Sequence, residues 1–206
     1  MKKDNSKQLK ELLNKLSNLD YIKTEDIPNI ALYMDQVTTF MDSRLENSKR
    51  YPEDKILTKT MINNYAKNQL LPSPDKKKYS KDHLILLIMI YYLKNILSIS
   101  DIQRLITPLT ERFFTNTSSE LNLSEIYTRL FALENDSSKQ LTKDIINHYK
   151  KSFEPFSDVK NDKDREYLHQ LSLISILSFD VYIKKQIIES MIDEMTPNKN
   201  DTKNKS

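Results

Sequence analysis

One segment, residues 58–80, combines amide and ammonium side chains in a pattern suited to binding a polyanion. Its candidate contact residues are Lys59, Asn63, Asn64, Lys67, Lys76, Lys77, Lys78 and Tyr79. Asparagine amides can pair with adenine edges, and lysine ammonium groups can meet guanine edges or phosphate. The three consecutive lysines would add salt-dependent affinity for a phosphate backbone without reading its sequence. These residue types point to double-stranded DNA as a partner, although the same side chains could simply face solvent.

The positive charge of the chain is concentrated around this segment. The whole chain carries a net charge of +3, from 32 Lys and Arg and 29 Asp and Glu. Between Lys49 and Lys94 there are ten basic and four acidic residues, a net charge of +6, which leaves the remainder at −3. A basic element in a slightly acidic protein is typical of a polyanion-binding face. On charge alone, a solvated lysine-rich surface is an equally good interpretation.

The side chains that usually carry catalysis are not arranged for it. The three histidines, His83, His148 and His169, are scattered and form no i, i+4 pair, and the chain contains no Cys. The sequence also lacks a Gly-x-Ser-x-Gly elbow and a phosphate-binding Walker motif. We therefore predict that the protein is not an enzyme and that it uses no metal or organic cofactor.

The absence of glycine constrains the fold. Glycine is the least strained source of positive φ, which tight hairpins and phosphate-cradling loops use. A β-sandwich, a P-loop enzyme or a Rossmann fold is therefore disfavoured. Helices joined by turns that contain Pro, Asn and Asp remain available, so the composition predicts an all-α fold.

The spacing of apolar residues predicts a series of helices. The predicted helices span residues 6–19, 28–45, 58–69, 80–97, 98–107, 124–133, 141–153 and 165–195. Thr58 and Ser80 are suited to cap the third and fourth of these, and Ser98 or Ser100 to cap the fifth. Pro108 is expected to interrupt the fifth helix, and residues 134–138 to break or bend the chain after the sixth. Residues 115–119 are predicted to form a polar loop.

Two of these helices stand out by their apolar content. Residues 84–93 form the longest unbroken apolar run and predict a helix that is buried on most faces. This run is shorter than the ~20 residues that span a bilayer, so no membrane segment is expected. The last helix carries an apolar stripe wider than a coiled-coil seam, interrupted by Lys184 and Lys185. Burial in the chain's own core is the favoured interpretation of that stripe, and a second subunit is the alternative.

The two ends of the chain are polar. The N-terminal sequence MKKDNSKQLKELL lacks the apolar core of a signal peptide. Together with the missing membrane segment and cysteines, it predicts a cytoplasmic protein. Residues 196–206 are predicted to be a disordered tail.

Four short motifs follow one another along residues 62–102. They are Ile62-Asn63-Asn64-Tyr65, Gln69-Leu70-Leu71-Pro72, Lys78-Tyr79-Ser80 and Ser98-Ile99-Ser100-Asp101-Ile102. In the same order, the MerR (mercury-resistance-type) regulators have a Leu-Arg-Tyr-Tyr helix, Gly-Leu-Leu-Pro, a wing ending in Tyr-Ser, and Ser-x-x-x-Ile. The segment therefore resembles the start of that family. The resemblance implies that residues 58–69 form the reading helix and that Lys76–Lys78 form a wing contact.

Several features depart from the MerR pattern. Asn63 stands where that family has a phosphate-binding Arg, and Gln69 stands where it has the turn glycine. A helix-turn-helix joins its helices by about 3–4 residues, whereas residues 46–57 intervene here. The absence of Cys excludes a thiol metal sensor.

Three further segments extend the resemblance to another group of proteins. They are Tyr33-Met34-Asp35-Gln36-Val37, Leu57-Thr58-Lys59-Thr60-Met61-Ile62-Asn63-Asn64-Tyr65 and Lys77-Lys78-Tyr79-Ser80. Taken whole, the chain resembles an uncharacterised bacterial family of unknown function that carries a MerR-like segment. That resemblance implies no activity of its own.

The predicted architecture is a MerR-like winged helix-turn-helix N-terminal half followed by a helical C-terminal half. The predicted divisions are an N-terminal helix and linker (1–27), a DNA-binding domain (28–110), a helical assembly or effector domain (120–195) and the tail (196–206). The predicted function is a DNA-binding transcriptional regulator, and the alternative is a helical protein–protein interaction module without nucleic-acid binding. Many helix-turn-helix regulators bind paired half-sites as dimers, so a homodimer is compatible with the sequence. No effector is indicated.

Overall fold

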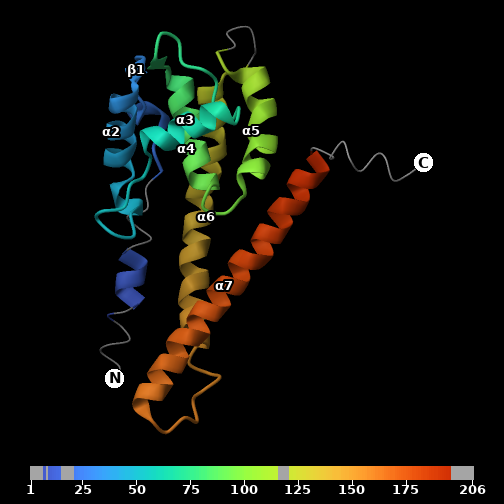
Figure 1. Cartoon of the computed structure of the whole chain (residues 1–206). Helices are drawn as coiled ribbons and strands as arrows, with labels where there is room; N and C mark the ends of the chain where they lie inside the picture. The colour runs from blue at the N-terminus through green and yellow to red at the C-terminus, as the bar shows by residue number, and fades with distance from the viewer. Residues whose placement is uncertain (1–6, 8, 15–20, 116–120, 196–206) are drawn as a thin grey trace, which may run out of the picture. The chain divides into compact units, whose positions relative to one another are not determined.

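The protein is mostly helical, which confirms the fold class expected from its composition (Figure 1). The computed structural model describes residues 7, 9–14, 21–115 and 121–195, and for residues 134–139 it describes the backbone alone. The elements are η1 (Thr24–Asp26), β1 (Leu32–Tyr33), α2 (Met34–Arg44), η2 (Glu46–Ser48), α3 (Lys59–Lys67), β2 (Lys78–Tyr79), α4 (Lys81–Leu93), α5 (Ile99–Phe113), α6 (Leu123–Lys151) and α7 (Asp162–Met195). Residues 9–14 are also helical, within the predicted helix 6–19. The predicted tail, residues 196–206, lies outside the described residues.

The chain divides into two compact units. Of the described residues, 21–115, 121–132 and 189–195 form one, called here the α2–α5 unit. Residues 7, 9–14 and 133–188 form the other, called here the α6–α7 unit. Helices α6 and α7 each contribute residues to both units.

Helix α4 supplies the core of the α2–α5 unit. Six of its side chains are completely buried: Leu84, Ile85, Leu86, Leu87, Ile88 and Ile90. Each buried Leu or Ile side chain contributes about 1.5–3 kcal/mol, so this helix alone accounts for a large share of the hydrophobic stabilisation. The helix begins after Ser80, as predicted, but it ends at Leu93 rather than at residue 97. Residues 94–96 form a turn instead, and the Leu97 N–H returns to the Leu93 carbonyl at 2.9 Å.

A short antiparallel pair of strands joins the start of α2 to the residues before α4. Leu32 pairs with Tyr79, and Tyr33 pairs with Lys78. The predicted start of this helix at residue 28 is therefore wrong: α2 begins at Met34, because the two preceding residues are extended and paired with β2. From Met34 onward the predicted periodicity holds, since Val37 and Met41 are both completely buried.

Two predicted helix interruptions are also wrong. Helix α5 begins after Ser98, as one of the two predicted caps requires, and it continues through Pro108 to Phe113. A proline inside a helix removes one backbone hydrogen bond but does not have to end the helix when packing holds both sides. Helix α6 is continuous across residues 134–138. Ordinary residues differ in helix propensity by less than ~1 kcal/mol, so a short polar stretch cannot by itself end a packed helix.

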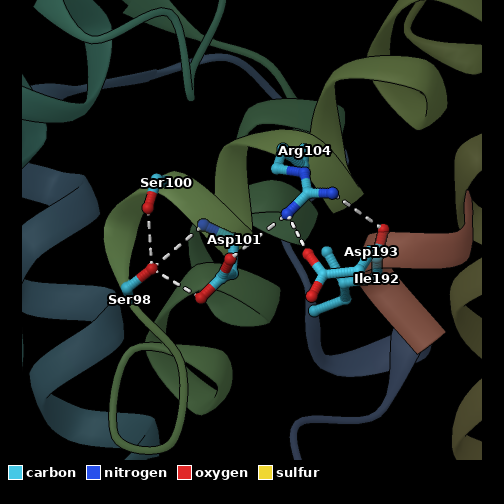
Figure 2. A network of polar contacts seen from close by, with 6 residues as sticks. All are labelled: Ser98, Ser100, Asp101, Arg104, Ile192 and Asp193. Carbon is cyan, nitrogen blue, oxygen red and sulfur yellow. Dashed lines mark hydrogen bonds and ion pairs between the residues drawn. The ribbon is translucent and has the colours of Figure 1, made fainter. Parts of the chain in front are cut away.

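An ion pair and a hydrogen bond join the last turn of α7 to α5 inside the α2–α5 unit (Figure 2). Arg104 Nη1 lies 2.6 Å from Asp193 Oδ1, and Arg104 Nη2 donates to the Ile192 carbonyl at 3.3 Å. The Ile192 side chain is 3% exposed. Asp101, which lies 3.8 Å from the same guanidinium, accepts a hydrogen bond from Ser98 Oγ at 2.6 Å. The cap of α5 and the end of α7 thus share one polar network.

In the α6–α7 unit, aromatic rings pack between α6 and the first turns of α7. His169 stacks on Phe153, with ring centroids 3.5 Å apart, and meets the Tyr149 ring edge-on at 5.1 Å. His169 and Leu173 are buried, which marks the face of α7 that packs here. The favoured prediction of core burial for the wider α7 stripe is wrong, because most of its large apolar side chains are exposed.

We expect Arg104→Gln to lower the free energy of unfolding by about 1 kcal/mol, because it removes a partly exposed ion pair and a charge-assisted hydrogen bond. Amides 189–193 should also exchange faster with solvent. Chemical denaturation and hydrogen exchange measure the two effects. Asp193→Asn is the matched variant, and it should cost about half as much because Arg104 still binds the Ile192 carbonyl. Equal costs would show that this carbonyl bond contributes nothing.

Candidate nucleic-acid interface

Helix α3 separates a buried apolar face from an exposed polar face. Thr58 caps it as predicted, because its Oγ1 accepts the Met61 N–H at 3.2 Å. Ile62 is completely buried and Tyr65 is 7% exposed, so both hold the helix to its unit. The exposed residues of this helix are Lys59, Thr60, Asn63, Asn64 and Lys67. They fall on neighbouring turns of one face, since residues three and four apart are adjacent on a helix surface.

The end of α3 turns the chain toward the lysine run. Gln69 adopts φ 57°, in the left-handed region. Its N–H returns to the Ala66 carbonyl at 3.2 Å, and the Leu70 N–H returns to the Tyr65 carbonyl at 2.9 Å. These two bonds form the Schellman motif that glycine usually closes. Leu70 and Leu71 are buried immediately afterwards, which anchors the turn.

The lysine run sits at the tip of a tight hairpin turn. The Lys78 N–H bonds to the Asp75 carbonyl at 2.8 Å, and the two residues between them have positive φ: 47° at Lys76 and 64° at Lys77. Two consecutive positive φ values define a type I′ turn, which normally uses Asn and Gly. All three lysines are exposed. Lysine occupies the two left-handed positions of this turn, so the tight hairpin forms without glycine.

The first turn of α2 brings the lysines of the helix and of the hairpin to the same place. Asp35 forms an ion pair with Lys59 of α3. Two residues earlier, the Tyr33 ring lies 5.2 Å from Lys78 Nζ. Among the described residues, Lys67, Lys76 and Lys77 form no ion pair, so their charges are available to a partner. Helix α3 and the hairpin therefore contribute to one basic surface.

Tyr79 differs from the other predicted contact residues because it is buried, with 3% of its surface exposed. Burial raises the pKa of its phenol. Its ring meets the His83 ring edge-on, with centroids 5.5 Å apart. The geometry therefore gives Tyr79 a supporting position beneath the hairpin.

His83 connects the hairpin to the start of α4. Its Nδ1 accepts the Ser80 N–H at 3.0 Å and lies 2.8 Å from Ser80 Oγ. The ring is 4% exposed and meets Phe114, just after α5, edge-on at 4.8 Å. Burial lowers the His83 pKa, and the carbonyls of Ser73 and Pro72 and the Asp82 charge partly oppose that effect. The sequence offered a faint signal for this role: a nitrogen acceptor three residues after a serine cap.

The long connector between α2 and α3 is buried at its two ends, whereas Tyr51 in its middle is exposed. Leu45, Ile56 and Leu57 are all buried, and Lys94 of the turn after α4 donates to the Ile56 carbonyl at 3.0 Å. Burial lowers the pKa of Lys94, whose ammonium also lies 4.8 Å from the Tyr91 ring centroid. Helix α3 packs against α2 and runs crosswise to it (Figure 1). The two helices thus meet despite the insertion between them.

The region that carries this surface also matches a protein-family model. The model, which covers residues 22–130, is that of a domain of unknown function, DUF1836. The chain belongs to the DUF1836 family. The match confirms the predicted membership of an uncharacterised family, and it contains every residue of the candidate interface. No curated protein matches the chain, and no solved structure matches it.

The DUF1836 region follows the structural division closely, since it spans most of residues 20–132 of the α2–α5 unit. Among the described residues of the chain, no group of His, Cys, Asp and Glu could hold a metal ion. Over those same residues, no helix has the length and apolar character needed to cross a membrane.

Gln69→Gly should stabilise the protein by about 0.5–1 kcal/mol, because glycine adopts the left-handed conformation without the clash of a Cβ. The melting temperature should rise by about 1–4 °C for a chain of this length. Gln69→Ala is the control, and it should leave the melting temperature nearly unchanged because it keeps the Cβ. A loss of stability in the glycine variant would instead reveal a contact made by the Gln69 side chain.

Stability should depend on pH through His83. Its pKa is lowered in the folded protein, so below about pH 6.5 the unfolded chain binds a proton that the folded chain does not. The stabilisation that neutral His83 gives the folded protein is fully present above that pH. It is lost as the pH falls through the folded-state pKa. Denaturation between pH 8 and pH 5 measures it.

His83→Gln provides the control, because glutamine three residues after a serine cap can still accept the cap N–H but does not titrate. Its pH profile should be flatter than that of the unsubstituted protein. Burial also lowers the pKa of His169, so His169→Gln should remove a separate part of the slope. A profile that neither substitution flattens would assign the pH dependence to other groups.

Proposed function

We propose that the α2–α5 unit binds double-stranded DNA as part of a MerR-like winged helix-turn-helix regulator. In this proposal α3 enters the major groove, and the hairpin of Lys76–Lys78 contacts the neighbouring phosphate backbone. The observation that carries the proposal is that lysines of α3 and of the hairpin both contact residues at the start of α2. Asp35 forms an ion pair with Lys59 of α3, and the Tyr33 ring lies beside the ammonium group of Lys78 in the hairpin.

The size of α3 suits a groove. With its side chains an α-helix is about 10–12 Å in diameter, which the ~12 Å width of the major groove of B-DNA admits, and the nine residues of α3 extend about 13 Å. Asn63 and Asn64 are exposed and would pair with adenine edges, while Lys67 would meet a guanine edge or phosphate. Lys59 would exchange its exposed partner Asp35 for a phosphate at little cost, since surface ion pairs contribute only about 0–1 kcal/mol.

The backbone geometry lends further support. The resemblance to MerR regulators aligns Gln69 with their turn glycine, and Gln69 has the positive φ that such a position requires. The backbone of Gln69 is therefore compatible with the turn that a MerR-like segment would require, although the residue type differs. Asn63 in place of an arginine removes one phosphate contact, and the unpaired lysines of the hairpin supply others.

The hairpin permits a test in which lost binding cannot be attributed to unfolding. Lys76→Asn together with Lys77→Gly removes two charges but installs the residues that a type I′ turn prefers. We expect the variant to be at least as stable as the unsubstituted protein. Its affinity for duplex DNA should fall, and the slope of log affinity against log salt should become shallower by about 2, or about 1 for each lost phosphate contact.

Fluorescence anisotropy at several salt concentrations measures this slope on a randomised duplex pool and on a duplex selected from it. Lys150→Gln with Lys151→Gln, on the α6–α7 unit, removes the same charge elsewhere and should leave the slope unchanged. Asn63→Ala with Asn64→Ala should keep the slope but reduce the preference for the selected duplex by about tenfold or more. Salt-independent binding, or an unchanged slope in the hairpin variant, would refute the proposal. Absence of binding at low salt would favour the protein-interaction module.

A further inference from the structure

The two-stranded sheet at the base of the hairpin has one buried face and one exposed face. The cross-strand pair Leu32 and Tyr79 is buried, with exposed fractions of 6% and 3%. The next pair, Tyr33 and Lys78, is exposed, and 54% of the Tyr33 surface is accessible. Directly opposed residues of an antiparallel pair project from the same face of the sheet. The Tyr33 ring therefore faces outward beside a lysine of the hairpin that the proposed function assigns to the phosphate backbone.

The position of the Tyr33 ring is fixed before any partner binds. Lys78 Nζ lies 5.2 Å from the ring centroid, within the ~6 Å range of a cation–π contact. The Tyr33 backbone pairs with β2, and its N–H donates to Gln36 Oε1 at 2.9 Å in the first turn of α2. A tyrosine side chain has only two χ angles, so binding through it costs little conformational entropy. Tyr33 thus presents a rigid aromatic group at the surface.

The charges around Tyr33 favour an anionic partner. Lys78 places an ammonium group beside the ring. Asp35, the nearest acidic residue along the chain, forms an ion pair with Lys59 of α3, which compensates its negative charge. The phenol O–H of a tyrosine can donate a hydrogen bond, and tyrosine is among the side chains that donate to the phosphate oxygens of DNA. A phosphate oxygen is therefore the acceptor that suits this position.

A second exposed tyrosine provides a contrast. Tyr51 of the connector is 51% exposed, and the Arg50 guanidinium lies 5.3 Å from its ring centroid. Its N–H, however, donates to the Asp54 carboxylate at 3.0 Å. Residues 46–57 contain three basic and three acidic residues, so this segment carries no net charge to attract a polyanion. Tyr51 and Tyr33 thus have similar exposure and a similar cation beside the ring, but different electrostatic surroundings.

We propose that Tyr33 is a further DNA-contact residue, which donates its phenol O–H to a phosphate oxygen and positions the Lys78 ammonium on the same stretch of backbone. The inference rests on the proposed DNA binding of the α2–α5 unit, and it adds a contact from β1 to those of α3 and the hairpin. The contact carries no sequence information, because every nucleotide has the same phosphate oxygens. Its role is to fix the orientation of α3 in the groove.

Tyr33→Phe separates the phenol O–H from the ring. The variant keeps the ring beside Lys78 and the strand pairing, so its melting temperature should be unchanged. Its affinity for a selected duplex should fall by about tenfold, because a hydrogen bond to a charged acceptor is lost. The slope of log affinity against log salt should stay the same, because no charge is removed. Fluorescence anisotropy at several salt concentrations measures both quantities, and Tyr51→Phe is the matched control that should bind like the unsubstituted protein.

Tyr33→Leu tests the positioning of Lys78. Leucine removes the ring as well as the phenol, so Lys78 loses the group that holds its ammonium. The salt slope of this variant should be shallower by up to about 1, the share of one phosphate contact, in addition to the loss of affinity seen with phenylalanine. An unchanged slope in a folded leucine variant would overturn the positioning of Lys78.

Duplexes that carry a single methylphosphonate identify the contacted phosphate. This group removes the charge of one phosphate and leaves the bases unaltered. At the phosphate that Tyr33 contacts, the losses from the methylphosphonate and from Tyr33→Phe should not add, whereas at distant phosphates they should add. This measurement needs only the phenylalanine variant, so it holds even where the leucine variant does not fold.

The outcomes separate this inference from the proposed function. Steeply salt-dependent binding by the unsubstituted protein, with equal binding by Tyr33→Phe, would overturn the Tyr33 contact and leave the DNA-binding proposal standing. Additive losses at every methylphosphonate position, or an equal loss in Tyr51→Phe, would do the same. Absence of DNA binding by the unsubstituted protein would overturn both proposals.

Discussion

The burial of helix α4 is the constraint on which the α2–α5 unit depends. Its apolar side chains point in all directions, so neighbouring elements must cover every side of it. Strand β2 and helix α5 pack against it, and Lys94 fixes the connector by donating to the Ile56 carbonyl. The position of α3, and therefore of its exposed asparagines, follows from this shared core rather than from a short turn between α2 and α3. The long connector is anchored because Leu45, Ile56 and Leu57 at its two ends are buried with the rest, whereas Tyr51 between them is exposed.

The residues at the start of α4 connect the buried helix to the exposed hairpin. His83 accepts the Ser80 N–H, meets Tyr79 on one side and Phe114 on another, and is covered by the loop that leads into the hairpin. The exposed hairpin lysines are thus followed directly in the chain by buried side chains, those of Tyr79 and His83. Preorganisation of this kind matters for binding, because fixing a contact loop beforehand reduces the entropy lost when a partner binds.

The two units present different surfaces. The α2–α5 unit offers amides and ammonium groups on α3 and the hairpin, whereas the α6–α7 unit offers apolar side chains along one helix. The physical chemistry of these surfaces differs accordingly: ionic contacts with a polyanion weaken with salt, while apolar burial does not. In the proposed regulator, the surface of the α2–α5 unit would bind DNA. Within the α2–α5 unit, the polar network of Arg104, Asp101 and Asp193 connects the last turn of α7 to α5 (Figure 2).

Local interactions were determined by the sequence itself. The caps at Thr58, Ser80 and Ser98, the buried run of α4, the outward face of α3 and the DUF1836 relationship all follow from residues close together in the chain. Tertiary structure decided the rest, because it depended on partners far along the sequence. Leu32 and Tyr33 became a strand by pairing with β2, packing carried α5 through Pro108, and Tyr79 turned inward onto His83. It also placed Gln69, Lys76 and Lys77 at positive φ, where the packed segments on either side compensate for the missing glycine. The sequence also did not predict that most large apolar side chains of α7 are exposed, because an apolar stripe has the same residues whether or not a core covers it.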